Sequence, residues 1–85
     1  MTKPQKAVAI VKKYVRDHLD KSDNIPDFQV YIVWYCFILG SMKFLISTTL
    51  LDGMYYEVTF NNQKNEWYLD AYKKFENKCI KEEEE

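Results

Sequence analysis

The chain has 85 residues, of which 47% are hydrophobic, 16% aromatic and 29% charged. A chain of this length forms one domain, and its many large rings supply the apolar area that so small a core needs to fold without a metal ion or a disulfide. The formal net charge of −1 disfavours nucleic acid as the partner, because a nucleic-acid footprint normally leaves an excess of positive charge. We therefore treat residues 1–85 as a single domain.

The first predicted element is an amphipathic helix over residues 3–19. Thr2 and Gln5 have the spacing of a capping box, and Pro4 falls in the first turn, where proline is tolerated. Apolar residues then recur at spacings of three and four, which places them on one side of the helix and the lysines on the other. These apolar residues are Val8, Val11, Val15 and Leu19. Residues 20–27 are mostly polar, include Pro26 and are typical of a loop.

After this loop the apolar pattern changes to a period of two, which is typical of β-strands. We expect strands over residues 28–39, 42–50 and 54–61, joined by turns at Gly40-Ser41 and Asp52-Gly53. Residues 62–65 form a further turn, and residues 66–69 have the composition of a short fourth strand. The predicted antiparallel β-meander covers residues 28–69.

The C-terminal part allows two interpretations. Asp70 is placed to cap a helix over residues 70–81, but the same apolar spacing also fits one continuous helix from about residue 66. Residues 82–85 form a solvated acidic tail. Both interpretations give an α+β fold: an N-terminal amphipathic helix packed on a three- to four-stranded antiparallel β-meander, with a short C-terminal helix. The apolar side of that last helix holds Tyr72, Phe75 and Cys79.

The sequence lacks the residue sets that catalytic and metal sites require. His18 is the only histidine, and we expect it to be a partly buried residue near the end of the first helix. The two glycines, Gly40 and Gly53, fall at turns and not in a phosphate-binding loop. Cys36 and Cys79 lack the spacing of metal ligands. We therefore expect no enzymatic activity, no metal and no cofactor.

The strongest functional signal is an apolar residue set on both sides of the predicted sheet. Strict alternation in the first strand places Ile32, Trp34, Cys36 and Ile38 on one side, where they form a core with the helix. The other side of a half-exposed antiparallel sheet is normally polar, and here it is aromatic. Either the C-terminal helix covers this second side or it is a protein interface. The candidate protein-binding residues on it are Tyr31, Val33, Tyr35, Phe37, Leu45 and Tyr55.

A nucleic-acid-binding module is the alternative function. It would use the basic outer side of the N-terminal helix to contact phosphates. Lysines on the solvent side of an amphipathic helix are nevertheless common, and the net charge is not basic. The candidate contacts are Lys6, Lys12, Lys13 and Arg16.

The segment Val30–Leu51 is long enough to cross a bilayer, but Lys43 lies near its middle and the residues suit two strands better. The sequence also begins without an apolar segment of the signal-peptide kind. We therefore expect a cytoplasmic protein with reduced cysteines and no membrane contact.

The segments Val33–Cys36, Ser47–Asn61 and Asp70–Ile80 resemble a family of small uncharacterised proteins from phages and prophages of Gram-positive bacteria. The similarity covers most of residues 8–80. This family has no established activity, so no functional residue carries over. The resemblance implies a phage accessory protein in the cytoplasm of the bacterial host. Its expected partner is a host or defence protein, or a second copy of itself in a dimer or other homo-oligomer.

Overall fold

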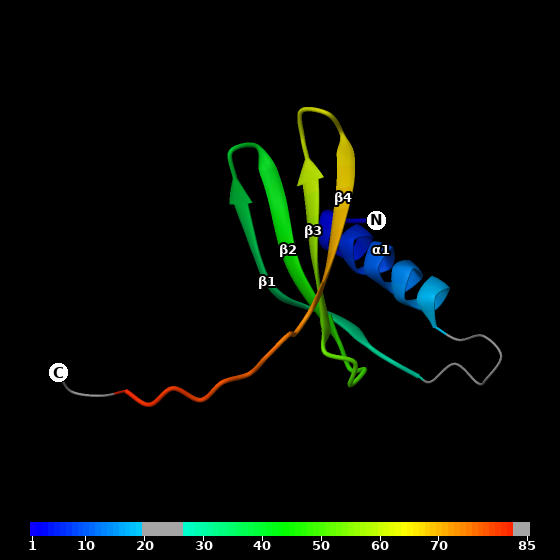
Figure 1. The fold of residues 1–85 in the computed structure, drawn as a ribbon. Helices are drawn as coiled ribbons and strands as arrows, with labels where there is room; N and C mark the ends of the chain where they lie inside the picture. Colours follow the sequence, from blue (N-terminus) through cyan, green and yellow to red (C-terminus); the bar gives the residue numbers. More distant parts are fainter. Residues whose placement is uncertain (20–26, 83–85) are drawn as a thin grey trace.

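The computed structural model describes residues 1–19 and 27–82, and it consists of one helix lying across one side of a four-stranded sheet (Figure 1). The strands follow one another in the order β1-β2-β3-β4, and each pairs antiparallel with the next. The predicted α+β class and the antiparallel meander are therefore confirmed. The elements are α1 (Lys3–His18), β1 (Val30–Ile38), β2 (Ser41–Thr48), β3 (Met54–Asn61) and β4 (Glu66–Lys73).

The helix begins at the capping box that the sequence predicts. The Thr2 hydroxyl accepts a hydrogen bond from the backbone N–H of Gln5 at 3.2 Å, and the Gln5 side chain accepts one from the backbone N–H of Thr2 at 2.9 Å. Two N–H groups that the first turn cannot satisfy are thus paired. Ala7, Val11 and Val15 are spaced by four residues and are buried against the sheet, so they fix which side of α1 faces the strands.

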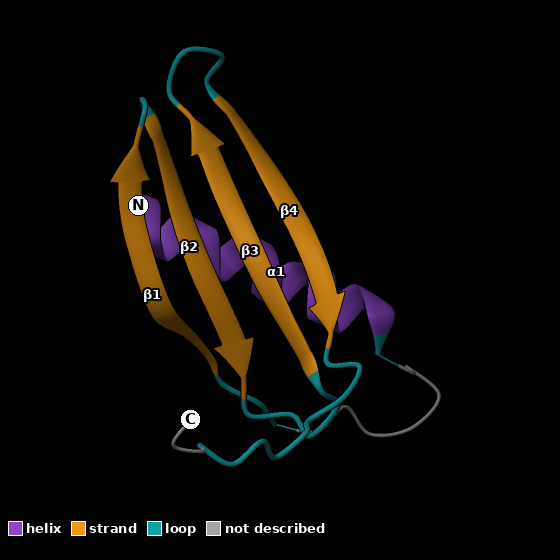
Figure 2. Cartoon of the chain, turned by 60° about the vertical axis from the view of Figure 1, so that its left-hand side comes forward, coloured by secondary structure: helices purple, strands orange, loops and turns teal. Residues whose placement is uncertain are grey.

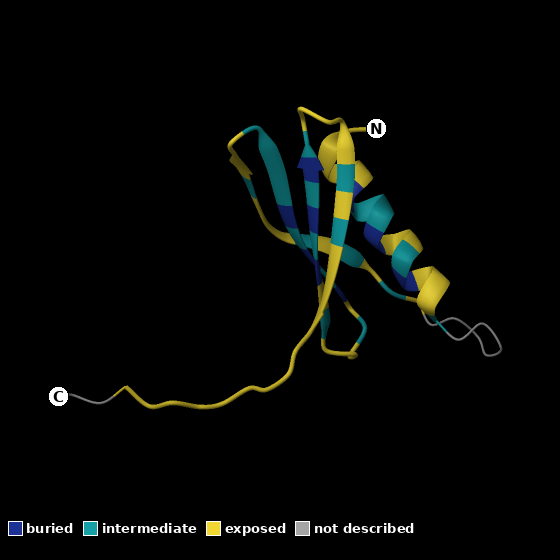
Figure 3. Cartoon of the chain, turned by 45° about the horizontal axis from the view of Figure 1, so that its top comes forward, coloured by how far each residue is buried: buried dark blue, intermediate teal, exposed yellow. Residues whose placement is uncertain are grey.

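The core is a single layer between α1 and the two central strands. Figure 3 shows the buried bands on β2, β3 and the inner side of α1. The side chains of Phe44, Ile46 and Val58 have no exposed surface, and Tyr56 is 3% exposed. Each strand therefore contributes every second residue to the core, as a sheet covered on one side requires.

A β-bulge at Val33 changes the sides of β1. Ile32 is opposite Ile46, but the next residue of β2, Leu45, is opposite Trp34. Val33 is thus an extra residue, and two residues of β1 occupy the space of one residue of β2. Beyond this point the alternation of β1 is inverted.

The inversion corrects the predicted sides of the first strand. Tyr35 is opposite the buried Phe44, so Tyr35 and Phe37 lie on the same side of the sheet as α1. Trp34 and Cys36 lie on the side that faces away from α1, although the sequence places them in the core. Strict alternation assumes an uninterrupted ladder, and one inserted residue reverses every position after it.

The predicted C-terminal helix over residues 70–81 is wrong. The strand β4 continues to Lys73, which is opposite Met54, so the whole length of β3 is paired. Residues 74–82 form neither helix nor strand and extend away from the sheet (Figure 1). The helical spacing of Tyr72, Phe75 and Cys79 gives too small an apolar side to outweigh eight paired strand residues.

Residues 66–70 are consequently strand, which decides between the two interpretations of this segment. The predicted loop lies outside the described residues except for Asp27, and so do Glu83–Glu85 of the acidic tail.

Candidate functional site

The side of the sheet that faces away from α1 is a candidate binding surface, here called the open face. Figure 2 looks onto this side, with α1 passing behind the strands. Residues that are opposite one another on neighbouring strands share a side, so the register identifies its members. No element formed by residues 1–19 or 27–82 lies over it. It comprises Tyr31, Trp34, Cys36, Ile38, Ser41, Lys43, Leu45, Ser47, Tyr55, Glu57, Thr59, Asn61, Glu66, Tyr68, Asp70 and Tyr72.

Large rings from three of the four strands are exposed on the open face. Trp34 is 56% exposed, and the tyrosines are each between 41% and 48% exposed. Tyr55 and Tyr72 are opposite one another and stack with their centroids 5.1 Å apart and their planes 15° apart. The hydroxyl of Tyr68 donates a hydrogen bond to the Glu66 carboxylate. These contacts hold some rings in place before any partner binds, so less side-chain entropy is lost on binding.

An ion pair lies among these rings. The Lys43 ammonium donates a hydrogen bond to the Glu57 carboxylate at 2.8 Å, and Asp70 is opposite Glu57 on β4. The hydrogen bond to Glu57 and the negative charge of Asp70 raise the pKa of Lys43. Including Glu66, the open face carries more negative than positive charge. It therefore suits a partner with apolar and basic side chains better than it suits a phosphate backbone.

The structure separates the six predicted protein-binding residues into two groups. Tyr31, Leu45 and Tyr55 lie on the open face as predicted. Val33 is the bulge residue, and Tyr35 and Phe37 lie on the α1 side. The last three are 56%, 62% and 65% exposed, because α1 does not cover that end of β1.

Several members of the open face were missed by reasoning from the sequence. Trp34 was assigned to the core because a bulge leaves no mark in the alternation pattern. Tyr72 was missed because residues 70–73 were assigned to a helix, and Tyr68 was missed because its segment also fitted a helix that begins at about residue 66. Their spacing of four fits a strand side as well as a helix side, so a strand continued to residue 73 would have identified both.

The four candidate nucleic-acid contacts are exposed on the outer side of α1. Among them, Lys13 pairs with Asp17 at 2.7 Å. The helix and the open face are on opposite sides of the sheet (Figure 2). The fold therefore does not bring the basic residues and the open-face rings onto one surface. The basic residues in question, the four candidate nucleic-acid contacts on α1, are Lys6, Lys12, Lys13 and Arg16.

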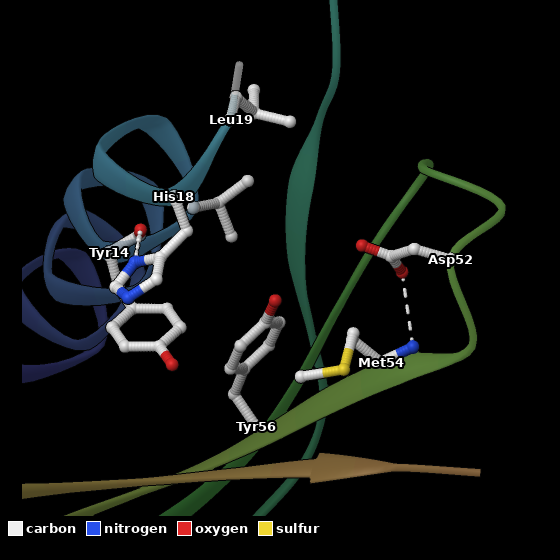
Figure 4. Close-up of a pocket in the computed structure, with 7 residues that line it drawn as sticks. Tyr14, His18, Leu19, Asp52, Met54 and Tyr56 are labelled. Atoms are coloured by element: carbon white, nitrogen blue, oxygen red, sulfur yellow. Dashed lines mark hydrogen bonds between the residues drawn. The ribbon is translucent and has the colours of Figure 1, made fainter.

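A hollow of about 230 Å³ lies between the end of α1 and the turn before β3 (Figure 4). His18 is exposed here and not partly buried as predicted; its Nδ1 donates to the Tyr14 carbonyl at 2.8 Å, and its ring stacks on that of Tyr14. Asp52 accepts from the backbone N–H of Met54 at 3.0 Å. Burial raises the pKa of the Tyr56 hydroxyl, which weakens it as a base or nucleophile.

No hydrogen bond joins His18, Asp52 and Tyr56 in the described part of the chain, so the hollow lacks the linked nucleophile and base that acyl or phosphoryl transfer uses.

The chain matches a protein family over most of its length. The profile of a family described as "Family of unknown function (DUF6275)" matches residues 4–82, which include α1 and all four strands. The chain belongs to DUF6275. Comparisons with curated proteins and with solved structures gave no match. The family description names no activity, so the function of this DUF6275 chain has to be argued from its own residues.

The described residues also lack two features that would indicate a function. Within residues 1–19 and 27–82, no three histidine, cysteine or acidic side chains gather in a way that could hold a metal ion. The same residues contain no helix with the length and apolarity that a bilayer crossing requires.

Proposed function

We propose that this chain is a non-enzymatic accessory protein of a phage or prophage and that it binds another protein through the open face. The partner is a protein of the bacterial host or of its defence systems. The observation that carries the proposal is the open face itself, an uncovered sheet surface with exposed rings from β1, β3 and β4. A surface of this kind marks an interaction site because a monomer normally covers it or makes it polar.

The chemistry of the open face favours a protein partner. Tryptophan and tyrosine are enriched among the residues that dominate binding energy, since each combines a large apolar area with a polar group. Here Trp34 lies next to Leu45, and the Tyr55–Tyr72 stack lies at the far end of β3 and β4. The acidic residues between them would select a partner with lysine or arginine at matching positions.

Nucleic acid is the weaker candidate partner. Aromatic sheet surfaces do bind single strands by stacking, but they do so within a positively charged groove that follows the backbone. On the open face Lys43 is already paired with Glu57, and Glu66 and Asp70 add negative charge. Phosphates would therefore be repelled from the rings that could stack the bases.

The phage origin rests on the resemblance of residues 8–80 to small phage and prophage proteins of Gram-positive bacteria. A DUF6275 match over residues 4–82 is compatible with this origin and does not specify a host. If the gene belongs to a prophage, its transcript should rise when the prophage is induced by DNA damage. A transcript that stays constant while structural phage genes rise would argue against this part of the proposal.

Site-specific photo-cross-linking in host cells tests the binding surface. A photoreactive phenylalanine analogue replaces Tyr68 on the open face or, as the control, Lys12 on the outer side of α1. We expect a discrete protein adduct from position 68 and none from position 12. The adduct partner is then purified, and Tyr68→Ala should weaken its binding by about tenfold or more, which corresponds to about 1.4 kcal/mol. Equal adducts from both positions, or an unchanged dissociation constant, would refute the open face as the site.

A further inference from the structure

The two edges of the sheet differ in how they are protected. Edge strands expose backbone N–H and C=O groups, and proteins commonly protect them with charged side chains. The edge strand β4 carries Glu66, Asp70 and Lys73. The other edge strand, β1, has nine residues and no charged side chain. A long edge strand without charged side chains can pair with a strand of another chain.

The backbone groups that β1 directs outward can be assigned from the register. In an antiparallel ladder, alternate residues direct both their N–H and C=O groups to the same neighbour. Leu39 and Gly40 have φ values of 48° and 78°, which is the geometry of a two-residue hairpin turn closed by Ile38 and Ser41. Ile38 therefore bonds to β2, and the preceding Phe37 directs its N–H and C=O away from the sheet, as does Tyr35.

Between its bulge and its turn, the β1 edge has a short segment of regular strand with one residue at its centre. It is limited by the bulge at Val33 on one side and by the turn at Leu39 on the other. The five residues between them, Trp34–Ile38, are centred on Cys36. Antiparallel pairing of this segment with its own copy about Cys36 uses all five residues, and it places the outward backbone groups of Tyr35 opposite those of Phe37. Each such pair exchanges two N–H···O bonds.

The side chains of the segment fit the same arrangement. Trp34 would lie opposite Ile38 on the open face, and Tyr35 opposite Phe37 on the α1 side. These four side chains are between 50% and 65% exposed in the single chain. Cross-strand contacts between aromatic and aliphatic side chains stabilise a sheet, and no charge on the segment opposes the approach. A hollow of about 680 Å³ beside the bulge, lined in part by Pro4 and Met42, leaves room next to this edge.

We propose that the protein forms a homodimer in which the β1 strands of two copies pair antiparallel about a two-fold axis at Cys36. The axis is perpendicular to the sheet, so the two four-stranded sheets become one and both copies of α1 lie on the same side. The two open faces join into one continuous surface. The proposal uses the strand edge and does not depend on the binding function of the open face.

Sedimentation of the wild-type chain and of Tyr35→Lys tests the dimer. We expect the wild type to have twice the mass of the chain and Tyr35→Lys to have half the wild-type mass, because a buried lysine would face Phe37 of the other copy. Far-ultraviolet circular dichroism checks the fold. Tyr35 stacks on the buried Phe44 at 6.1 Å, so Phe37→Lys serves as a second variant if Tyr35→Lys unfolds. A wild type that stays monomeric up to its solubility limit, or folded variants that remain dimeric, would overturn the proposal.

Oxidative cross-linking tests the register. Cys36 would be opposite its own copy at a position without backbone bonds, where the Cα atoms are about 4.5 Å apart and within disulfide range. In a Cys79→Ser background, mild oxidation with diamide should yield a covalent dimer on a non-reducing gel. No covalent dimer from a sample that sediments as a dimer would overturn the two-fold axis at Cys36. Tyr68→Ala should remain a dimer while binding the partner protein about tenfold or more weakly, which separates this proposal from the proposed function.

Discussion

Adjacent residues of β2 provide the sharpest test of a core on only one side of the sheet. Phe44 faces α1 with no exposed surface, and its neighbour Leu45 faces away and is half-buried. Truncation of a fully buried phenylalanine to alanine costs about 3–5 kcal/mol, which includes the cavity left behind. Complete burial of a leucine side chain is worth about 1.5–3 kcal/mol. Leu45 is partly exposed and its truncation leaves no enclosed cavity, so Leu45→Ala should lose about 1–2 kcal/mol.

Urea denaturation followed by tryptophan fluorescence measures both changes. Thermal denaturation gives a second comparison, since for a chain of this size each kcal/mol corresponds to about 4–8 °C in melting temperature. Leu45→Ala should melt about 4–16 °C lower than the wild type, and Phe44→Ala about 12–40 °C lower. Whole domains are stable by only about 5–15 kcal/mol, so Phe44→Ala can be largely unfolded. In that case Phe44→Leu takes its place, with a smaller loss of the same sign.

Equal losses for the two positions would refute the reasoning. A helix covering the open face, which is one of the two alternatives that the sequence leaves open, would bury Leu45 as completely as Phe44. The ratio of the two losses therefore reports directly whether the second side of the sheet is covered. Both variants are compared with the wild type at one protein concentration, because association would add to the measured stability.

Two further predictions concern the tail and the core tyrosine. Deletion of residues 75–85 should shift the melting temperature by no more than a few degrees, since Phe75 and Ile80 are 98% and 84% exposed and changes at such positions are worth about ±0.5 kcal/mol. A loss of ten degrees would show that the tail is docked. Burial raises the pKa of Tyr56 above its ordinary value of about 10, so its contribution to stability is complete below pH 10 and declines as the pH rises further. Tyr56→Phe should therefore lose less stability than the wild type between neutral pH and about pH 11 in urea titrations; an identical decline in both would contradict this.

The sequence alone predicted the parts of the fold that depend on local pattern. The capping box at Thr2 and the four-residue spacing of Val11 and Val15 specify α1, because both act within a few residues of the chain. The strands predicted over residues 42–50 and 54–61 are observed as β2 and β3, and simple alternation accounts for the burial of Phe44, Tyr56 and Val58 because neither strand contains a bulge. The candidate site was identified in outline as well, because Tyr31 precedes the bulge of β1 and Leu45 and Tyr55 lie in strands without a bulge.

Only the tertiary structure decided the sides of β1 and the end of β4. The bulge at Val33 is defined by which residue of β2 lies opposite it, and that pairing is absent from the pattern of either strand alone. The segment around Tyr72 has a period that suits helix and strand equally, and pairing with β3 selects the strand by bonding its backbone along its whole length. The open face follows from these two decisions together. Trp34 is turned onto it by a long-range register. The open face stays uncovered because residues 70–73 of the predicted helix belong to β4 and residues 74–82 extend away from the sheet (Figure 1).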